Sequence, residues 1–311
     1  MFRTVSPRAR RQAGFTTIEL MIALVIALLV VGALLEAMLS ALRSDRYADA
    51  LAQVTDDAGF ALAVMREQVA QAGFSTAHAA SSSSSSSSPA APASAALALH
   101  AFPPVLGCAG ANFRDIGAAI LAPPACDVAS ADPSASDALE VAWEASVLPA
   151  SSSNAILGGR DGTEPFDCLG NSFAKTPDPD EGDYYLSDSK FYVAAGSLFC
   201  HGPGNAAGAA LAQNIENLHV TYGMSGAAAG QSGGDQVAYY DAAPPIGAPA
   251  WANVVAIRLC VQARSAAKVL DADAMAAIGA YVDCGDVRRS SSDGVLRRTF
   301  STTVVLQNRL P

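Results

Sequence analysis

The sequence predicts an α+β fold, in which one long N-terminal helix packs on an antiparallel β-sheet head with large loops. Three observations support this prediction. No proline interrupts residues 15–72, where apolar residues recur at helical spacing. Most later segments are short runs that alternate between apolar and polar residues, as strands do. Loops rich in Gly, Pro and Asp separate those runs, and a long helix followed by many strands indicates a helix that covers an antiparallel sheet.

The first part of the helix is apolar enough to cross a membrane. Residues 15–35 carry a single charge, that of Glu19, and 21 residues are enough to span a hydrocarbon core of about 30 Å. The preceding segment, residues 1–14, has no acidic residue and is basic through Arg3, Arg8, Arg10 and Arg11. Since positive flanks stay inside, residues 1–14 are expected in the cytoplasm and the head in the periplasm.

The helical pattern continues beyond the apolar stretch. Residues 36–73 are amphipathic, and Gly73 is a suitable C-terminal stop. The expected helix has about 58 residues and a length of about 87 Å at the standard rise. Its first half is predicted to lie in lipid and its second half to pack on the head. Apolar positions that support this are Leu39, Leu42, Leu51, Val54, Leu62, Met65 and Val69.

Glu19 is the residue that a plain membrane anchor does not explain, because a charge there costs about 3 kcal/mol on insertion scales. The run from Gly14 to Leu20 (GFTTIEL) resembles the leader junction of the type IV pilin superfamily. The resemblance implies that a prepilin peptidase cuts between Gly14 and Phe15 and that Phe15 becomes N-methylated. An ordinary secretory signal would instead be cut after its apolar region, which would then be lost.

The resemblance also implies a role for Glu19 in assembly. After cleavage Glu19 is the fifth residue, and in a filament its carboxylate can meet the α-amino group of a neighbouring subunit. In apolar surroundings such a pair is tolerated where either charge alone is not. We therefore expect Glu19 to set the register between subunits.

The rest of the chain reads as a β-rich head, residues 98–311. Strands are expected at 138–143, 190–193, 218–222, 253–261 and 299–306, with a short helix at 272–279. The ordered blocks LFCHG (198–202), NIENL (214–218), VTYG (220–223), WANVV (251–255) and RRTFSTTVVLQNR (297–309) resemble the minor pilin PilW family. The resemblance implies a pilin-like architecture.

The net charge of the chain and one low-complexity segment limit the functions that the protein can have. The formal net charge is −10, and removing a leader with four arginines and no acid lowers it by four, to −14. Such an acidic head is a poor candidate for nucleic-acid binding. Residues 74–97, which contain the serine run 81–88, lack the apolar surface needed to fold. They are predicted to be a flexible insertion, with a glycosylated stalk as the alternative.

Six cysteines follow the membrane segment, which points to an oxidising compartment and to disulfides. Sequential pairing closes three modest loops, but six cysteines allow fifteen arrangements, so the connectivity stays open. A zinc site is disfavoured because no C-x-x-C occurs and the histidines do not cluster. The six cysteines that we expect to form disulfides are Cys108, Cys126, Cys168, Cys200, Cys260 and Cys284.

Other candidate sites are weak. The carboxylates of residues 178–183 (DPDEGD) could bind calcium, yet their spacing is not that of an EF-hand, and a solvated turn is favoured. We expect His201 in a loop and His219 on a strand, half-buried. Neither a Rossmann glycine motif nor a G-x-S-x-G elbow is present, so the sequence predicts no catalytic set, no cofactor and no metal site.

Three functions follow from these observations. The first is a minor pilin that helps prime assembly of a type IV pilus and is located near its tip. The second is a type II secretion pseudopilin, which shares the leader, the helix and Glu19. The third, an enzyme on a pilin anchor, lacks a catalytic motif. The expected partners are a prepilin peptidase, major and other minor pilins, a large tip adhesin and inner-membrane lipid.

Overall fold

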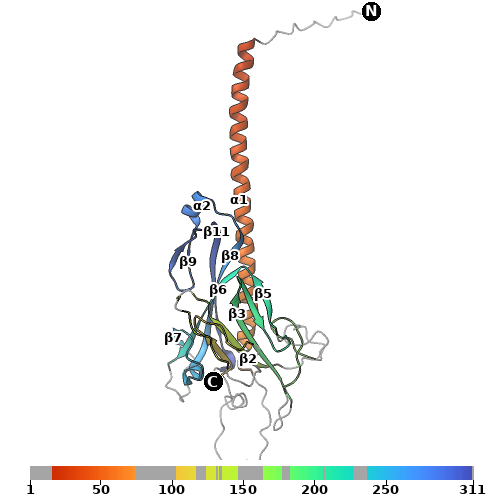
Figure 1. Cartoon of the computed structure of the whole chain (residues 1–311), viewed down its shortest axis with the longest axis vertical. Coiled ribbons are helices and arrows are strands. Elements are labelled where there is room, and N and C mark those ends of the chain that lie inside the picture. Colours follow the sequence, from red (N-terminus) through yellow and green to blue (C-terminus); the bar gives the residue numbers. More distant parts are fainter. Residues whose placement is uncertain are drawn as a thin grey trace, which may run out of the picture. The chain divides into compact units, whose positions relative to one another are not determined.

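The computed structural model describes residues 16–74, 103–116, 124–130, 132, 135–145, 164–176, 183–205, 207–226 and 237–309 (Figure 1). The chain divides into two units, residues 1–49 and residues 50–311. Gly14, Phe15, the serine run and most of the 178–183 loop lie outside the described residues.

The long helix α1 spans Thr17–Gln71, close to the expected range. It ends where Gly73 adopts a φ of +77°, a left-handed conformation that glycine tolerates best. Asn308 caps this end, since its Nδ2 donates to the carbonyl oxygen of Gln71 at 3.2 Å. Within the second unit, α1 buries one face, formed by Ala50, Val54, Ala58, Ala61, Met65, Gln68 and Val69.

A five-stranded antiparallel sheet follows the chain order β1-β2-β3-β4-β5. Such a meander needs only local connections between neighbouring strands. Its strands are β1 (Val105–Cys108), β2 (Ala138–Ala145), β3 (Tyr185–Ala194), β4 (Ser197–His201) and β5 (Ala209–Gln213).

A four-stranded antiparallel sheet has the order β11-β8-β6-β7. Its strands are β6 (Ile215–Ser225), β7 (Val237–Asp241), β8 (Val254–Lys268) and β11 (Val295–Val305). Between β8 and β11 the chain forms α2 (Ala272–Ile278) and the antiparallel pair β9 (Ala280–Val282) and β10 (Arg288–Ser290). Short 3-10 helices cover Pro249–Asn253 and Gln307–Arg309.

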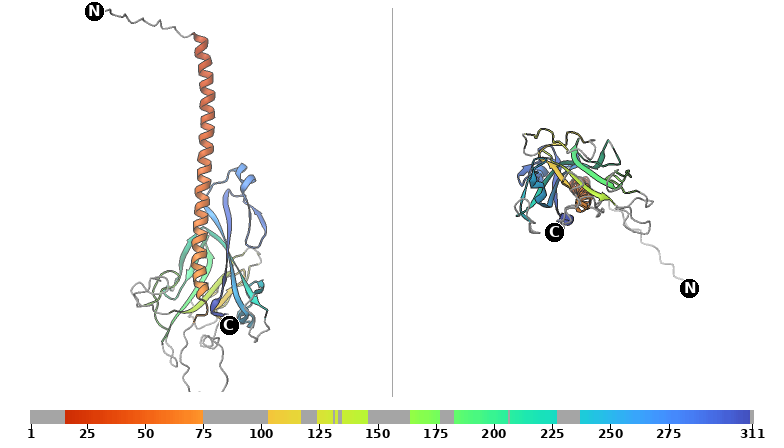
Figure 2. Two further views of the ribbon diagram at one scale, coloured as in Figure 1. Left: turned by 180° about the vertical axis from the view of Figure 1, so that it is seen from behind. Right: turned by 90° about the horizontal axis from the view of Figure 1, so that it is seen from below.

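One hydrophobic core joins the end of α1 to both sheets. Figure 2 shows the C-terminal part of α1 beside the strands. Gln68 of α1 is buried there, and its Oε1 accepts from Trp143 Nε1 at 3.3 Å and from Ser189 Oγ at 3.1 Å. In the four-stranded sheet, Tyr222 packs edge to face on Trp251. The α+β architecture predicted from the sequence is confirmed, with each expected strand and the short helix present.

One placement in the sequence analysis was wrong. His201 is the last residue of β4 rather than a loop residue, and it is buried. The glycines and proline that follow it suggested a loop, but the strand continues because Lys190 of β3 pairs with His201.

Candidate functional site

Glu19 lies in the first turn of α1, where it forms a capping box with Thr16. Its Oε2 accepts from the backbone N–H of Thr16 at 3.0 Å and from Thr16 Oγ1 at 3.1 Å. The backbone N–H of Glu19 in turn donates to Thr16 Oγ1 at 3.3 Å. These bonds satisfy N–H groups that a helix start leaves without partners. The T-x-x-E spacing signals this cap, and the sequence analysis missed it.

The apolar surface of α1 is exposed over the whole first unit. Large side chains from Ile18 to Leu42 are 44–70% exposed, with Leu42 the least and Met21 and Leu29 the most. The helix is long and apolar enough to cross a membrane, with a mean hydropathy of 2.9 in its most apolar window. Exposure of so much apolar surface indicates an apolar partner, either lipid or protein.

Three disulfides close successive loops of the head, in the sequential arrangement. Cys108 pairs with Cys126, Cys168 with Cys200, and Cys260 with Cys284. Their Cα atoms are 5.6, 6.4 and 5.8 Å apart, within the usual range for disulfides. All six cysteines are therefore paired, and none is left to ligate a metal.

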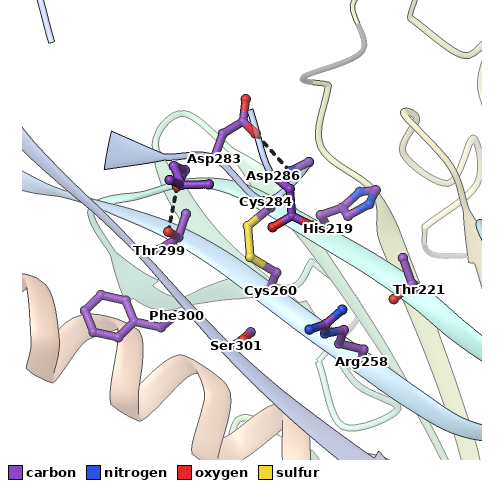
Figure 3. Close-up of a pocket in the computed structure, with 12 residues that line it drawn as sticks. His219, Thr221, Arg258, Cys260, Asp283, Cys284, Asp286, Thr299, Phe300 and Ser301 are labelled. Carbon is purple, nitrogen blue, oxygen red and sulfur yellow. Dashed lines mark hydrogen bonds between the residues drawn. A yellow bond between two sulfur atoms is a disulfide. The ribbon is translucent and has the colours of Figure 1, made fainter. Parts of the chain in front are cut away.

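The Cys260–Cys284 disulfide holds the β9–β10 segment against the outer face of the four-stranded sheet (Figure 3). Open clefts of about 330 Å³ and 440 Å³ lie beside this disulfide, and His219, Asp283 and Cys284 line both. Thr299 Oγ1 adds a hydrogen bond to the carbonyl oxygen of Val282 at 2.7 Å. The floor of the smaller cleft is polar, with Thr221, Arg258 and Ser301.

His219 is fixed in this cleft by a buried carboxylate. Its Nδ1 lies 2.9 Å from Asp137 Oδ2, while Asp137 also accepts from the backbone N–H groups of Gly110 and Val220. The hydrogen bond to Asp137 raises the pKa of His219, and the negative charges of Asp283 and Asp286 act in the same direction. His219 is a half-buried strand residue, as expected, with a side chain 34% exposed.

Across the described parts of the chain, no group of three or more His, Cys, Asp or Glu side chains is arranged to hold a metal ion. The calcium prediction for residues 178–183 falls largely outside the described residues. Gly202 and Gly204 instead pack on Asp167, whose Oδ2 accepts from the Gly204 N–H at 3.2 Å.

The chain matches two families of known proteins. The PilW family, described as Type IV Pilus-assembly protein W, matches residues 183–308. The prokaryotic N-terminal methylation motif matches residues 9–35. A type IV-like pilin from Thermus thermophilus is similar at 14% sequence identity and a TM-score of 0.27, covering 56% of this chain and 79% of that one. No curated protein matches the sequence.

The long apolar N-terminal helix, the methylation motif at its start and the antiparallel β head are features that this chain has in common with type IV pilin-like proteins. The match to the PilW family covers less than half of the chain, from just before β3 to the last 3-10 helix. The motif at the helix start implies that a prepilin peptidase processes the chain. Together with the apolar helix, it supports a pilus component that is anchored in a membrane.

Proposed function

We propose that this protein is a minor pilin of a type IV pilus, helps prime pilus assembly and is located near the tip. The observation that carries this proposal is the combination of the methylation motif over residues 9–35 with the PilW domain. The head would lie in the periplasm before incorporation and on the surface afterwards. Its partners would be the major pilin, other minor pilins and a large tip adhesin.

In this proposal the peptidase cuts between Gly14 and Phe15, and Phe15 becomes the methylated N-terminus. Glu19 then lies one helical turn from the new amino group. The apolar helix surface of the first unit supplies the membrane anchor before assembly. An intact-mass measurement on protein from pili should give a chain that starts at methylated Phe15. A chain that starts at Met1 in sheared pili would contradict it.

The capping box allows the charge of Glu19 to be tested apart from its hydrogen bonds. Glu19→Gln keeps a capping side chain, since Gln serves at this position, but removes the negative charge. Thr16→Ala removes the hydroxyl that accepts from the Glu19 N–H, and keeps the charge. We expect Glu19→Gln to abolish incorporation into pili, Thr16→Ala to reduce it modestly, and leader cleavage to continue in both.

The measurement is immunoblotting of sheared pili against membrane fractions, with Glu36→Gln on the same helix as the matched control. Normal incorporation of Glu19→Gln would refute the assembly role. A type II secretion pseudopilin is the second candidate, and deletion of the gene separates the two. Loss of surface pili with secretion intact is expected, and lost secretion with intact pili would refute the proposal.

A further inference from the structure

Three charged side chains lie together on one face of the five-stranded sheet, inside the head. Lys190 Nζ lies 2.6 Å from Asp188 Oδ2 and 3.1 Å from Glu140 Oε1. The side chains of Lys190 and Asp188 are each 3% exposed, and that of Glu140 is 11% exposed. Lys is among the residues least often buried in proteins, so the cluster requires an explanation.

The strand register brings these groups together. Glu140 of β2 lies directly opposite Lys190 of β3, and Asp188 is two residues before Lys190 on the same face. Leu106 of β1 flanks Glu140 on its other side, and His201 of β4 lies opposite Lys190. Backbone pairing, rather than flexible loops, therefore holds the Lys190 amine and the two carboxyl groups at contact distance.

The cluster is poorly satisfied as a set of ions. Among the residues that the structure describes, no cation or N–H group reaches Oε2 of Glu140 or Oδ1 of Asp188, and the two carboxyl groups lie in hydrogen-bond contact with each other. A single ammonium faces two carboxyl groups, so full ionisation would leave a net negative charge buried in the protein. Burial, together with the charge of Asp188, raises the pKa of Glu140, which favours the neutral, protonated form of its carboxyl group.

We propose that Lys190 and Glu140 condense to an amide, with Asp188 as the proton acceptor, so that an isopeptide bond links strands β2 and β3. Asp188, the closest group to the ammonium, takes a proton from Lys190. The neutral amine then attacks Cδ of the protonated Glu140 carboxyl group. A carbon–nitrogen bond forms and the carbon–oxygen bond to the Glu140 hydroxyl breaks.

The step balances without any further reactant. Of the two protons lost by the ammonium, one ends on Asp188 and the other leaves with the Glu140 hydroxyl as water. The site starts with one buried cation and one buried anion and ends with none, which removes the cost of keeping ions away from water. Fixed contact between reacting groups is known to accelerate such steps strongly in intramolecular reactions.

Mass spectrometry on the full chain tests this proposal, which does not depend on the function in pili. The detergent-purified protein is reduced, alkylated and cleaved after aromatic residues, which separates Glu140 from Lys190 at Trp143 and Tyr185. We expect a branched peptide that is lighter than its two parts by one water, with fragments that place the link at Glu140 and Lys190. Two linear peptides with unmodified side chains would overturn the proposal.

Variants locate the reacting groups. Lys190→Arg keeps a cation but removes the amine nucleophile, so the branched peptide should disappear. Asp188→Asn should slow its appearance after synthesis. The matched control, Lys268→Arg at the exposed end of β8, should leave it intact. Loss of water within the β3 peptide alone would place the bond at Asp188 and refute the link between strands. The wild-type result stands even where a variant fails to fold.

Discussion

The two sheets of the head differ in how many faces are buried. In the five-stranded sheet, seven successive residues of β3, from Leu186 to Tyr192, are buried, so both faces are covered. In the four-stranded sheet, β8 alternates between buried Ile257, Leu259 and Val261 and more exposed residues between them. The five-stranded sheet is thus a central layer of the head, whereas the four-stranded sheet has one half-exposed face, although both have the same pleated geometry.

The difference comes from what covers each sheet. One face of β3 meets α1 through Gln68, and the other meets a small cluster that includes Phe113 from the loop closed by Cys108–Cys126. The outer face of the four-stranded sheet is covered only in part, by the β9–β10 segment, which leaves the two clefts. The buried cluster of Lys190, Asp188 and Glu140 therefore lies in the five-stranded sheet, while the four-stranded sheet offers an accessible surface.

The largest expected effect comes from removing the Cys168–Cys200 disulfide, which is attached to β4 of the five-stranded sheet. Cys200 is fully buried and Cys168 nearly so, and their bond closes a sequence separation of 32. We expect Cys168→Ala with Cys200→Ala to lower the free energy of unfolding by about 4 kcal/mol, from loop entropy plus lost packing. Denaturant unfolding of the purified chain measures it.

Removal of the Cys260–Cys284 disulfide is the matched comparison. This bond closes a sequence separation of 24, so its loop entropy is similar to that of Cys168–Cys200. Both of its cysteines, however, line an open cleft. We expect Cys260→Ser with Cys284→Ser to cost about 3 kcal/mol or less and to increase hydrogen exchange in β9 and β10. If both disulfide removals lowered the free energy of unfolding equally, the proposed difference in burial between the two sheets would have no effect on stability, contrary to this prediction.

A smaller effect is expected where the sheets meet. A Cβ on Gly107 of β1 would collide with the hydroxyl of Tyr222 from β6 and lie 3.0 Å from the carbonyl oxygen of Ala138. We expect Gly107→Ala to cost about 2 kcal/mol through overpacking, with partial recovery in the double variant with Tyr222→Phe. Thermal unfolding measures both.

Tyr222→Phe alone is the control for that experiment. The Tyr222 hydroxyl is buried, and no hydrogen-bond partner for it lies within the described ranges. Its removal should therefore change stability by less than about 1 kcal/mol. A large loss in Tyr222→Phe would show that the hydroxyl has a partner and would refute the overpacking argument.

The smallest effect concerns the half-exposed sheet. The pKa of His219 is raised in the folded protein, so its contribution to stability is fully present below its unfolded pKa of about 6.5 and is lost as the pH rises through the higher folded pKa. Because the side chain is about one-third exposed, we expect a loss of less than about 1 kcal/mol. Melting temperatures across this range should show a decline that His219→Gln lacks.

Local patterns in the sequence predicted much of the fold. The uninterrupted helical period predicted α1, and alternation predicted β2, β3 and β6, because side-chain periodicity is set by local backbone geometry. A high content of β-branched residues predicted β8 and β11. The His201 error has a local cause as well, since the glycines after β4 obscured the pairing with β3. The Thr16–Glu19 capping box could also have been predicted, because a Thr and a Glu lie three residues apart at the helix start.

By itself the sequence determined the match to the N-terminal methylation motif, because the apolar helix, the basic flank and Glu19 are neighbours along the chain. Only the tertiary structure decided which of the fifteen cysteine pairings is close enough to form, and which residue faces Lys190. Glu140 and Lys190 are 50 positions apart, and no local pattern specifies the register that joins them. That register depends on how β2 and β3 bury both their faces at once.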